Sequence, residues 1–260
     1  MLACRIQNKI SRFFARPHKA PLLIAGNQKS GTSAIAALLA EGCHLPYTID
    51  VFYRYPRMEQ QLLKKEVNLH RSIWRARHEF SKSVVKEPSF FLFQAGLSQE
   101  FPLAKWVHII RDPRDNIRSI LNRLQISGSL DKLTEEVNGV LNVSPDEWRL
   151  VLDGRLAGHA RGHYIETLAA RCQLAASAAL EMEARTVIVR YEDFLLDKLI
   201  FLKELAGKLE LEWRGGIEDR LEVPFQPKGD SSSEHAVFFG DNLERINREC
   251  AGMMQRYGYH

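Results

Sequence analysis

A glycine-rich turn after a short apolar run is the part of this sequence best suited to chemistry. Residues 26–33 read Gly-Asn-Gln-Lys-Ser-Gly-Thr-Ser and follow the apolar residues 21–25. Such a turn points backbone N–H groups and the N-terminus of the next helix at one place, where an anion binds favourably. The Walker motif of ATPases requires G-x-x-x-x-G-K-[ST]. Here Thr32 follows the second glycine, Gly31, and Lys29 precedes it, so the sequence predicts an anion cradle that differs from an ordinary ATPase loop.

Three more charged turns follow apolar runs of the kind that form strands. They are Lys86-Glu87-Pro88, Arg111-Asp112-Pro113-Arg114-Asp115 and Arg190-Tyr191-Glu192-Asp193. In a parallel α/β sheet, ligands bind at the carboxyl ends of the strands. Four such turns, three of them basic, indicate a multiply anionic ligand that spans one edge of the sheet.

The elements that must position these turns are short apolar strands that alternate with longer helices. The predicted strands are Leu22–Ala25, Ser83–Val85, Trp106–Ile110 and Thr186–Val189. They are mostly apolar, as expected of strands that helices cover on both faces. The alternation predicts the α/β class, with a P-loop-like, mostly parallel sheet flanked by helices on both faces.

Helix signals lie between the strands and after the last one. A first helix is expected from about Gly31 to Glu41, with Gly42 as its C-terminal stop, and a second begins at Pro113 with Asp112 as N-cap. Further helices are predicted within Arg155–Glu183 and at about Leu196–Leu209. A last helix buries residues 243, 246, 250, 253 and 257. Residues Val223–Gly240, with two prolines, two glycines and three serines in a row, are interpreted as a loop or lid.

At this point the chain resembles the sulfotransferases that use 3′-phosphoadenosine 5′-phosphosulfate (PAPS). The block GNQKSGTSAIAALLA resembles their 5′-phosphosulfate loop, and WVHIIRDPRDNIRS resembles their 3′-phosphate motif. The block VIVRYEDFLLD resembles a strand-and-turn block later in the family. The resemblance covers roughly residues 20 to 260, and it is closer to the carbohydrate and tyrosyl enzymes than to the cytosolic phenol and steroid enzymes.

The resemblance implies a role for each residue that would bind PAPS or its product 3′-phosphoadenosine 5′-phosphate (PAP). Lys29 would contact the oxygen that bridges phosphate and sulfate, where negative charge grows in the transition state. Arg111 and Ser119 would bind the 3′-phosphate, although Arg111 could instead pair with Asp112 or Asp115. The remaining donor-binding residues implied by the motifs are Ser30, Gly31, Thr32, Ser33, Tyr191 and Lys228. For Tyr191 a half-buried position after an edge strand is an equally simple interpretation, and for Lys228 a plain loop lysine.

The catalytic base is left open between several residues, because the acceptor hydroxyl must lose a proton to a nearby side chain. The phenol and steroid enzymes use a histidine in a K-T-H block, and here the aligned residues are Lys86-Glu87-Pro88. The tyrosyl enzymes use a carboxylate about twenty residues after the phosphosulfate loop, which corresponds to Asp50. Glu87 is the second choice and His70 the third. Lys86 would steady the sulfate or orient the acceptor. Sulfuryl transfer from PAPS needs no metal ion, and the sequence shows no cluster of metal ligands.

Composition sets the broad class of the protein. The chain has 260 residues, 45% of them hydrophobic, and a net charge of +4. This length and composition predict one domain over residues 20–260, and the mild charge does not call for nucleic acid. Cys4, Cys43, Cys172 and Cys250 are scattered, which is typical of reduced thiols in a cytoplasmic protein. No apolar stretch approaches the roughly 20 residues that cross a bilayer.

Two basic segments remain open to more than one interpretation. Residues 1–19 could form a lead-in, an amphipathic helix on an anionic surface or an organelle-targeting segment. Residues 54–78 could be a solvated basic helix or a surface that binds an acidic acceptor.

Three functions are compatible with these residues. The first is a PAPS-dependent sulfotransferase that acts on a hydroxyl or amine of a carbohydrate, lipid or peptidyl acceptor. The second is a P-loop kinase or other nucleoside triphosphatase, and the third a non-catalytic nucleotide-binding protein on the same fold. Oligomeric state is not encoded in any pattern that we can interpret.

Overall fold

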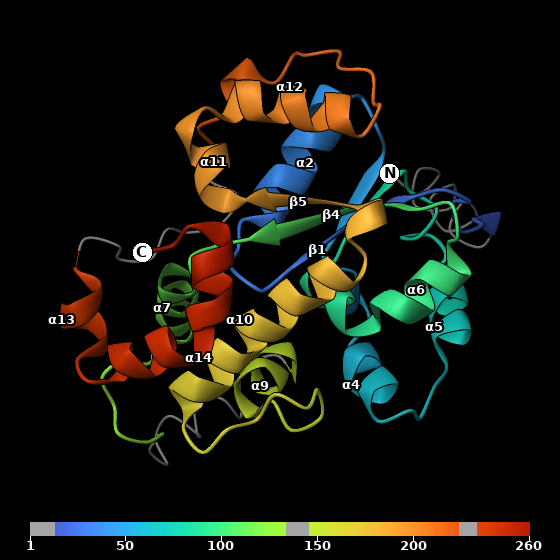
Figure 1. Ribbon diagram of the computed structural model, residues 1–260. Helices are drawn as coiled ribbons and strands as arrows, with labels where there is room; N and C mark the ends of the chain where they lie inside the picture. Colours follow the sequence, from blue (N-terminus) through green and yellow to red (C-terminus); the bar gives the residue numbers. More distant parts are fainter. Residues whose placement is uncertain (1–13, 134–145, 224–232) are drawn as a thin grey trace, which may run out of the picture.

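The computed structural model describes residues 14–133, 146–223 and 233–260, which build an α/β fold around one parallel sheet (Figure 1). The sheet has five strands in the order β2-β3-β1-β4-β5, and each neighbouring pair is parallel. The predicted mostly parallel α/β class is therefore confirmed. Lys228 and residues 1–13 of the basic lead-in lie outside the described residues.

The strands are β1 (Leu22–Gly26), β2 (Tyr47–Ile49), β3 (Val84–Lys86), β4 (Lys105–Ile110) and β5 (Thr186–Arg190). Four of them coincide with the sequence predictions to within a residue or two. The strand β2 was not predicted, because three residues at the edge of a sheet give too short a pattern to recognise. The prediction that Lys86 lies in the turn after β3 is wrong: it is the last residue of that strand and is 1% exposed.

The helices lie between and after the strands. The α-helices are α2 (Thr32–Gly42), α3 (Val51–Arg54), α4 (Met58–Leu63), α5 (Leu69–Arg75), α6 (Gln94–Glu100), α7 (Pro113–Leu124), α9 (Asp146–Asp153), α10 (Tyr164–Glu181), α11 (Tyr191–Leu196), α12 (Lys198–Lys208), α13 (His235–Phe239) and α14 (Asn242–Tyr257). The described residues also form the short 3-10 helices η1 (Pro88–Phe93), η2 (Glu183–Arg185) and η3 (Glu218–Arg220).

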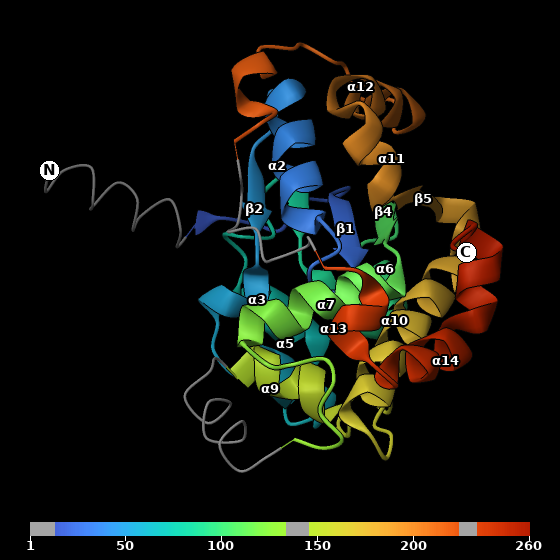
Figure 2. The ribbon, with the colours of Figure 1, turned by 90° about the vertical axis from the view of Figure 1, so that its left-hand side faces the viewer.

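Helices cover both faces of the sheet, as expected. Figure 1 and Figure 2 show α2, α11 and α12 above the sheet and α7, α9, α10 and α14 below it. Successive side chains of β1 pack against the two helical layers alternately, because strand side chains alternate between the faces of the sheet. Leu22 and Ile24 pack toward α2 and α12, whereas Leu23 and Ala25 pack toward the layer that contains Phe52.

The helix α7 begins as its sequence predicts. The Asp112 carboxylate accepts a hydrogen bond of 2.8 Å from the backbone N–H of Arg114, and Pro113 occupies the first turn. An N-cap of this kind satisfies one of the backbone donors that a helix start leaves unpaired. The cap fixes where α7 starts relative to the end of β4.

One helix end differs from its prediction by a residue, and another helix occupies part of its predicted range. Gly42 is the last residue of α2 rather than a left-handed stop after it, and a Cβ there would lie 2.3 Å from the Trp213 ring. Close packing against Trp213 therefore explains why position 42 is a glycine. The helix predicted within Arg155–Glu183 is α10, which begins at Tyr164 because His163 caps it and because Gly154 and Gly158 take positive φ in the preceding segment. In Val223–Gly240, predicted as a loop, residues 235–239 form α13.

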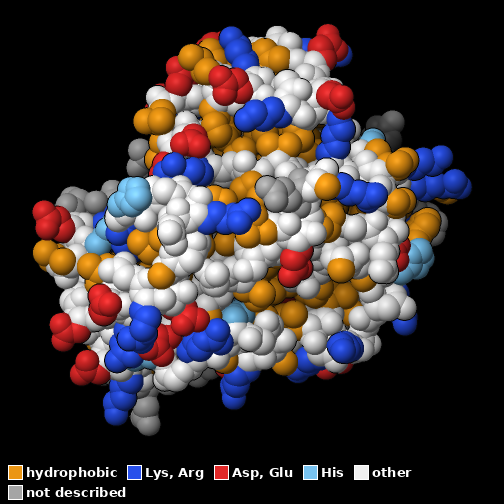
Figure 3. Space-filling model, in the orientation of Figure 1, with side chains coloured by type: hydrophobic (Ala, Val, Ile, Leu, Met, Phe, Trp, Pro, Cys, Tyr) orange, Lys and Arg blue, Asp and Glu red, His pale blue; other side chains and the backbone are white. Residues whose placement is uncertain are grey.

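The surface carries both charge signs without a continuous basic stripe on the face shown in Figure 3. Apolar side chains are exposed over α11 and α12, among them Leu195, Leu196 and Ile200. This mixture agrees with the mild net charge of +4. In the described part of the chain no helix is long and apolar enough to span a membrane.

Candidate functional site

The predicted cradle lies at the centre of the sheet, in the turn between β1 and α2. Gly26 ends β1 so close to β4 that a Cβ there would lie 2.6 Å from the carbonyl oxygen of Ile109. Lys29 and Gly31 take left-handed conformations, with φ of 66° and 80°. The Gly31 carbonyl accepts from the Ile35 N–H at 3.1 Å. The turn therefore leads directly into the first turn of α2, whose Thr32 and Ser33 are buried.

A buried polar network holds this turn from below. The Asn116 amide on α7 donates to the Gln28 carbonyl at 2.8 Å and to the Ser30 hydroxyl at 2.9 Å, and its oxygen accepts from the Asn27 amide at 2.8 Å. The Arg171 guanidinium on α10 donates to Asn27 Oδ1 at 3.0 Å and to Gln28 Oε1 at 2.8 Å. Satisfied buried networks of this kind fix one conformation, so α7 and α10 set the shape of the turn.

Neither Asn116 nor Arg171 was recognised from the sequence. Arg171 carried a usable signal: it lies three residues after Leu168 and four before Ala175, both buried. A lone arginine on the buried face of a helix needs a polar partner. Asn116 carried no comparable signal, because it stands in a charged run at the start of its helix.

The second anion-binding candidate, Arg111, contacts the first directly. Its Nη1 donates to the Lys29 carbonyl at 2.7 Å, and its guanidinium lies 4.8 Å from the centre of the Tyr191 ring. Its Nε is buried and has no hydrogen-bond partner among the described residues. The strands β1 and β4 are neighbours, so the two basic turns meet at the same edge of the sheet.

The alternative of an ion pair between Arg111 and the following aspartates is not what the structure shows. Asp112 pairs with Arg114 at 2.6 Å, and Asp115 pairs with Arg118 at 2.5 Å. Asp115 also contacts His235 Nε2 at 2.8 Å. Burial raises the pKa of Asp115, but this contact and the charges of Arg111 and Arg118 outweigh it and lower the pKa overall. The aspartates therefore pair with other cations, and the buried Nε of Arg111 is left without a partner among the described residues.

Tyr191 lies close to this pair, and Ser119 is on the face of α7 that carries Asn116. Ser119 is half-buried on α7, three residues after Asn116 and four before Arg123, which is the spacing of one helix face. Asn116 contacts the turn, so this face is directed toward it. The Tyr191 ring packs on Gly31, where a Cβ would lie 2.2 Å from two ring carbons. Tyr191 thus lies between the cradle and Arg111.

A third polar cluster consists of Lys86, Asp50 and Ser33. The buried Lys86 ammonium donates to Ser33 Oγ at 2.9 Å and forms an ion pair with the Asp50 carboxylate. Asp50 follows β2, takes a left-handed φ of 55°, and keeps 38% of its side chain exposed. A non-glycine residue in this conformation is strained, and such strain gathers at functional sites. Two residues predicted to be catalytic are therefore in contact, and Asp50 is open to an incoming molecule.

Glu87 lies beside this group but faces the backbone. Its Oε2 accepts from the Phe52 N–H at 3.0 Å and its Oε1 from the Ser89 N–H at 3.4 Å. Burial raises the pKa of Glu87 to about 8; the Lys86 charge opposes the shift, and Glu59 and Asp50 add to it. A buried carboxyl that holds two chain segments together is better suited to structure than to proton transfer with an external hydroxyl.

His70 is remote from these residues. Its Nδ1 lies 2.8 Å from Glu100, the last residue of α6, which precedes the start of β4. Figure 1 shows α5 and α6 beyond the ends at which the strands begin. The anion cradle lies where the strands end, so the geometry does not bring His70 to it.

The gathered positive charge makes the site suited to a multiply charged anion. Burial lowers the pKa of Lys29, and the charges of Arg111, Arg123 and Lys86 lower it further. A bound anion would relieve that repulsion. Over residues 14–133, 146–223 and 233–260 no group of three His, Cys, Asp or Glu side chains could hold a metal ion.

Comparison with known proteins places the fold among solved sulfotransferase structures. The sulfotransferase STF9 from Mycobacterium avium has a TM-score of 0.61 at 13% identity, over 98% of this chain and 80% of that one. Mouse sulfotransferase SULT7A1 in complex with PAP has a TM-score of 0.52 at 13% identity, over 94% and 87%. STF1 from Mycobacterium tuberculosis has a TM-score of 0.50 at 13% identity, over 95% and 80%. No family model and no curated protein sequence matches the chain. The chain shares the sulfotransferase fold.

Proposed function

We propose that this protein is a sulfotransferase that moves a sulfuryl group from PAPS to a hydroxyl or amine of a carbohydrate, lipid or peptidyl acceptor. The observation that carries the proposal is the contact between the cradle and Arg111, through the 2.7 Å hydrogen bond to the Lys29 carbonyl. Two basic sites that touch suit one ligand with two anionic ends. The shared sulfotransferase fold, and the PAP named with SULT7A1, support this choice of ligand.

The donor would lie along the carboxyl edge of the sheet. Its 5′-phosphosulfate would occupy the turn from Lys29 to Ser33, whose backbone N–H groups and hydroxyls suit oxyanions. Its 3′-phosphate would take the buried Nε of Arg111, which has no partner in the described chain, and the hydroxyl of Ser119. Tyr191 would contact the adenosine between these two ends, and Lys228 remains a proposed contact.

Each catalytic role follows from where charge changes in the reaction. The acceptor oxygen attacks sulfur, the bond from sulfur to the bridging oxygen breaks, and PAP leaves with an added negative charge. A fixed Lys29 ammonium at that oxygen stabilises the transition state more than the ground state. The acceptor proton passes to Asp50, which is the exposed carboxylate of the group.

Lys86 connects the proposed base to the cradle. Its ammonium contacts both Asp50 and the Ser33 hydroxyl, so it would hold the acceptor side and the donor side in register. The absence of a K-T-H block favours carbohydrate, lipid or peptidyl acceptors over phenols and steroids. We further propose that residues 20–260 act as one domain in the cytoplasm.

The experiment has two readouts, donor binding and transfer. PAP at about 100 times its dissociation constant should stabilise the fold by about 2.7 kcal/mol, measured as a thermal shift, and ATP with magnesium should do less. The double variant R111A/S119A should lose the shift, whereas Arg149→Ala, an exposed arginine on α9, should keep it. A larger response to ATP with magnesium would favour a kinase.

Transfer of labelled sulfate from PAPS to a panel of glycans, lipids and peptides tests the reaction itself. Asp50→Asn should lower turnover by about 10² to 10⁴ and leave PAP binding intact, because removing a general base has this size of effect. Donor binding without transfer to any acceptor would support the non-catalytic alternative. If Asp50→Asn turns over like the parent, another residue is the base.

A further inference from the structure

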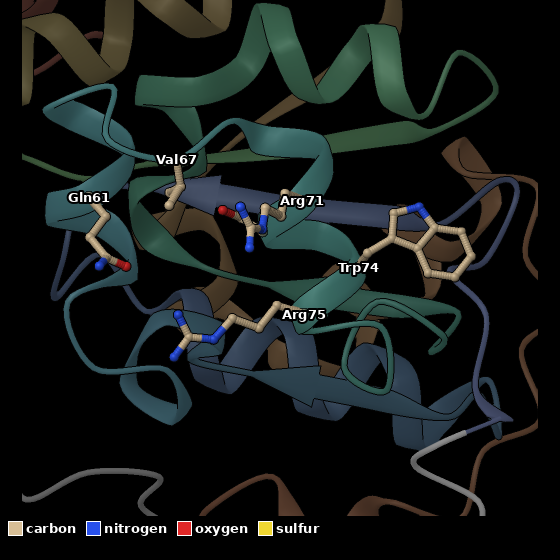
Figure 4. A pocket seen from close by; sticks show the side chains of 6 residues that line it. Gln61, Val67, Arg71, Trp74 and Arg75 are labelled. Atoms are coloured by element: carbon tan, nitrogen blue, oxygen red, sulfur yellow. The ribbon is translucent and has the colours of Figure 1, made fainter.

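A second basic site lies between α4 and α5, apart from the donor site. There the structure has a hollow of about 580 Å³, lined by Gln61, Val67, Arg71, Ser72, Trp74 and Arg75. Figure 4 shows Arg75 extending from α5 toward the side of Gln61, and Trp74 on the other side of that helix. The size of the hollow is within the range of small-molecule sites.

Arg71 and Arg75 supply uncompensated charge to this hollow. They are one helical turn apart, so their charges repel each other. In the described chain neither guanidinium has a hydrogen-bond or ion-pair partner, and no acidic residue lines the hollow. The nearest acidic groups in sequence are engaged: Glu66 pairs with Lys64 at 3.8 Å, and Glu79 accepts from the Tyr55 hydroxyl at 2.5 Å.

The other lining residues indicate what would accompany an anion. The Gln61 amide can both donate to and accept from a hydroxyl group. Trp74 is 44% exposed on the side of α5 away from Gln61, and Val67 adds apolar surface on the side of Gln61. The two guanidinium groups, the Gln61 amide and the exposed Trp74 indole together suit a molecule that has anionic groups, hydroxyls and an apolar ring face.

We propose that the hollow binds an anionic carbohydrate through two oxyanion groups, sulfate, phosphate or carboxylate, about one helical turn apart. Each guanidinium presents a planar fork of N–H donors to one group. The site is distinct from the donor site, since α5 lies beyond the starts of the strands and the cradle lies at their ends (Figure 1). The proposal does not depend on the sulfotransferase function.

Calorimetric titration with sucrose octasulfate, a small sulfated sugar, tests the site. The double variant R71A/R75A should bind it at least about tenfold more weakly, because charge-assisted hydrogen bonds are lost. The matched control is K203A/K208A, which removes the same charge from exposed lysines on α12 and should bind like the parent. All three proteins should unfold in urea at closely similar midpoints, which shows that they are folded, and their thermal shift with PAP tests the donor site separately.

Titrations with other ligands distinguish an anionic carbohydrate from a free anion or a lipid headgroup. Neutral sucrose should not bind, and inorganic sulfate should bind far more weakly than sucrose octasulfate because it can engage only one position at a time. Equal weakening in R71A/R75A and K203A/K208A would overturn the proposal, since it would mean general charge attraction. Tight binding of inorganic sulfate alone, or binding only to phosphatidylserine vesicles, would overturn it as well.

Discussion

Lys29 stands in a left-handed conformation, φ 66°, at the point where the two basic turns meet. For a residue with a Cβ this conformation costs roughly 1–2 kcal/mol, and it persists because Asn116 and Arg171 fix the residues around it. The pKa of Lys29 is lowered for a separate reason: the fold holds its ammonium in a partly buried place beside other cations. A bound anion would relieve the repulsion between these cations.

Replacing Lys29 separates its charge from its conformation. Lys29→Ala and Lys29→Gly should both lower turnover by about 10² to 10³, the size of effect seen when one donor to a developing anion is removed. The glycine variant should be about 1 kcal/mol more stable than the alanine variant, because glycine tolerates positive φ. Single-turnover kinetics and urea unfolding measure the two effects. Unchanged turnover in both variants would remove Lys29 from the reaction.

Glu87 should make stability depend on pH. Burial raises its pKa from 4.5 in the unfolded chain to about 8 in the fold. A carboxyl with a raised folded pKa contributes stability fully below pH 4.5, and that contribution is lost as pH rises through 8. The disadvantage of Glu87→Gln relative to the parent should therefore shrink between these pH values, measured as the difference in Tm. A difference that is constant with pH would show that Glu87 is ionised in the fold throughout.

At the scale of elements, the site is a set of strand ends with a helix packed under them. The order β3-β1-β4 puts Lys86, the cradle and Arg111 side by side, and α7 and α10 support the cradle from one face of the sheet. Tyr191, at the start of α11, covers Gly31 from the other direction. The spacing between Tyr191 and the cradle therefore depends on glycine at position 31.

Gly31→Ala should disturb this packing in two ways. The new Cβ would lie 2.2 Å from the Tyr191 ring, and φ is 80°, so we expect weaker PAP binding and a loss of at least about 1 kcal/mol of stability. In stability, the double variant G31A/Y191A should recover the part that comes from the clash and keep the part that comes from φ; its PAP binding should stay weak, because the proposed contact of Tyr191 with the adenosine is lost. Calorimetry with PAP and urea unfolding measure both. If Tyr191→Ala gives no recovery, backbone strain alone accounts for the loss.

At the scale of the whole molecule, the described cysteines are part of the core. Cys43, Cys172 and Cys250 are free and buried. Burial raises the pKa of Cys43, raises that of Cys172 to about 12, and raises that of Cys250 as well. A thiol must ionise to react, so these three are protected for as long as the fold is intact.

This protection predicts a simple titration. With a thiol reagent at neutral pH, Cys43, Cys172 and Cys250 should react only as the protein unfolds, and PAP should slow them further because it stabilises the folded state. Variants that keep one of these cysteines at a time identify each rate. Fast labelling of any of the three in the native protein would contradict the packing described here.

The sequence by itself determined the parts of this protein that neighbouring residues specify. The apolar runs predicted β1, β3, β4 and β5, the alternation predicted the parallel α/β fold, and Asp112 with Pro113 predicted the start of α7. The glycine and lysine order of residues 26–33 indicated an anion cradle. These features are local, because propensity, capping and turn chemistry act over a few residues.

Only the tertiary structure decided which distant residues meet. The contacts of Asp50 with Lys86, of Asn116 with Asn27 and of Arg171 with Gln28 depend on strand order and on how α7 and α10 pack. No short window of sequence contains that information. The same holds for β2, whose three residues become a strand by pairing with β3, and for Gly42, which Trp213 requires. Long-range contacts are fixed by the whole core at once, and they determine which of several plausible side chains stand at one site.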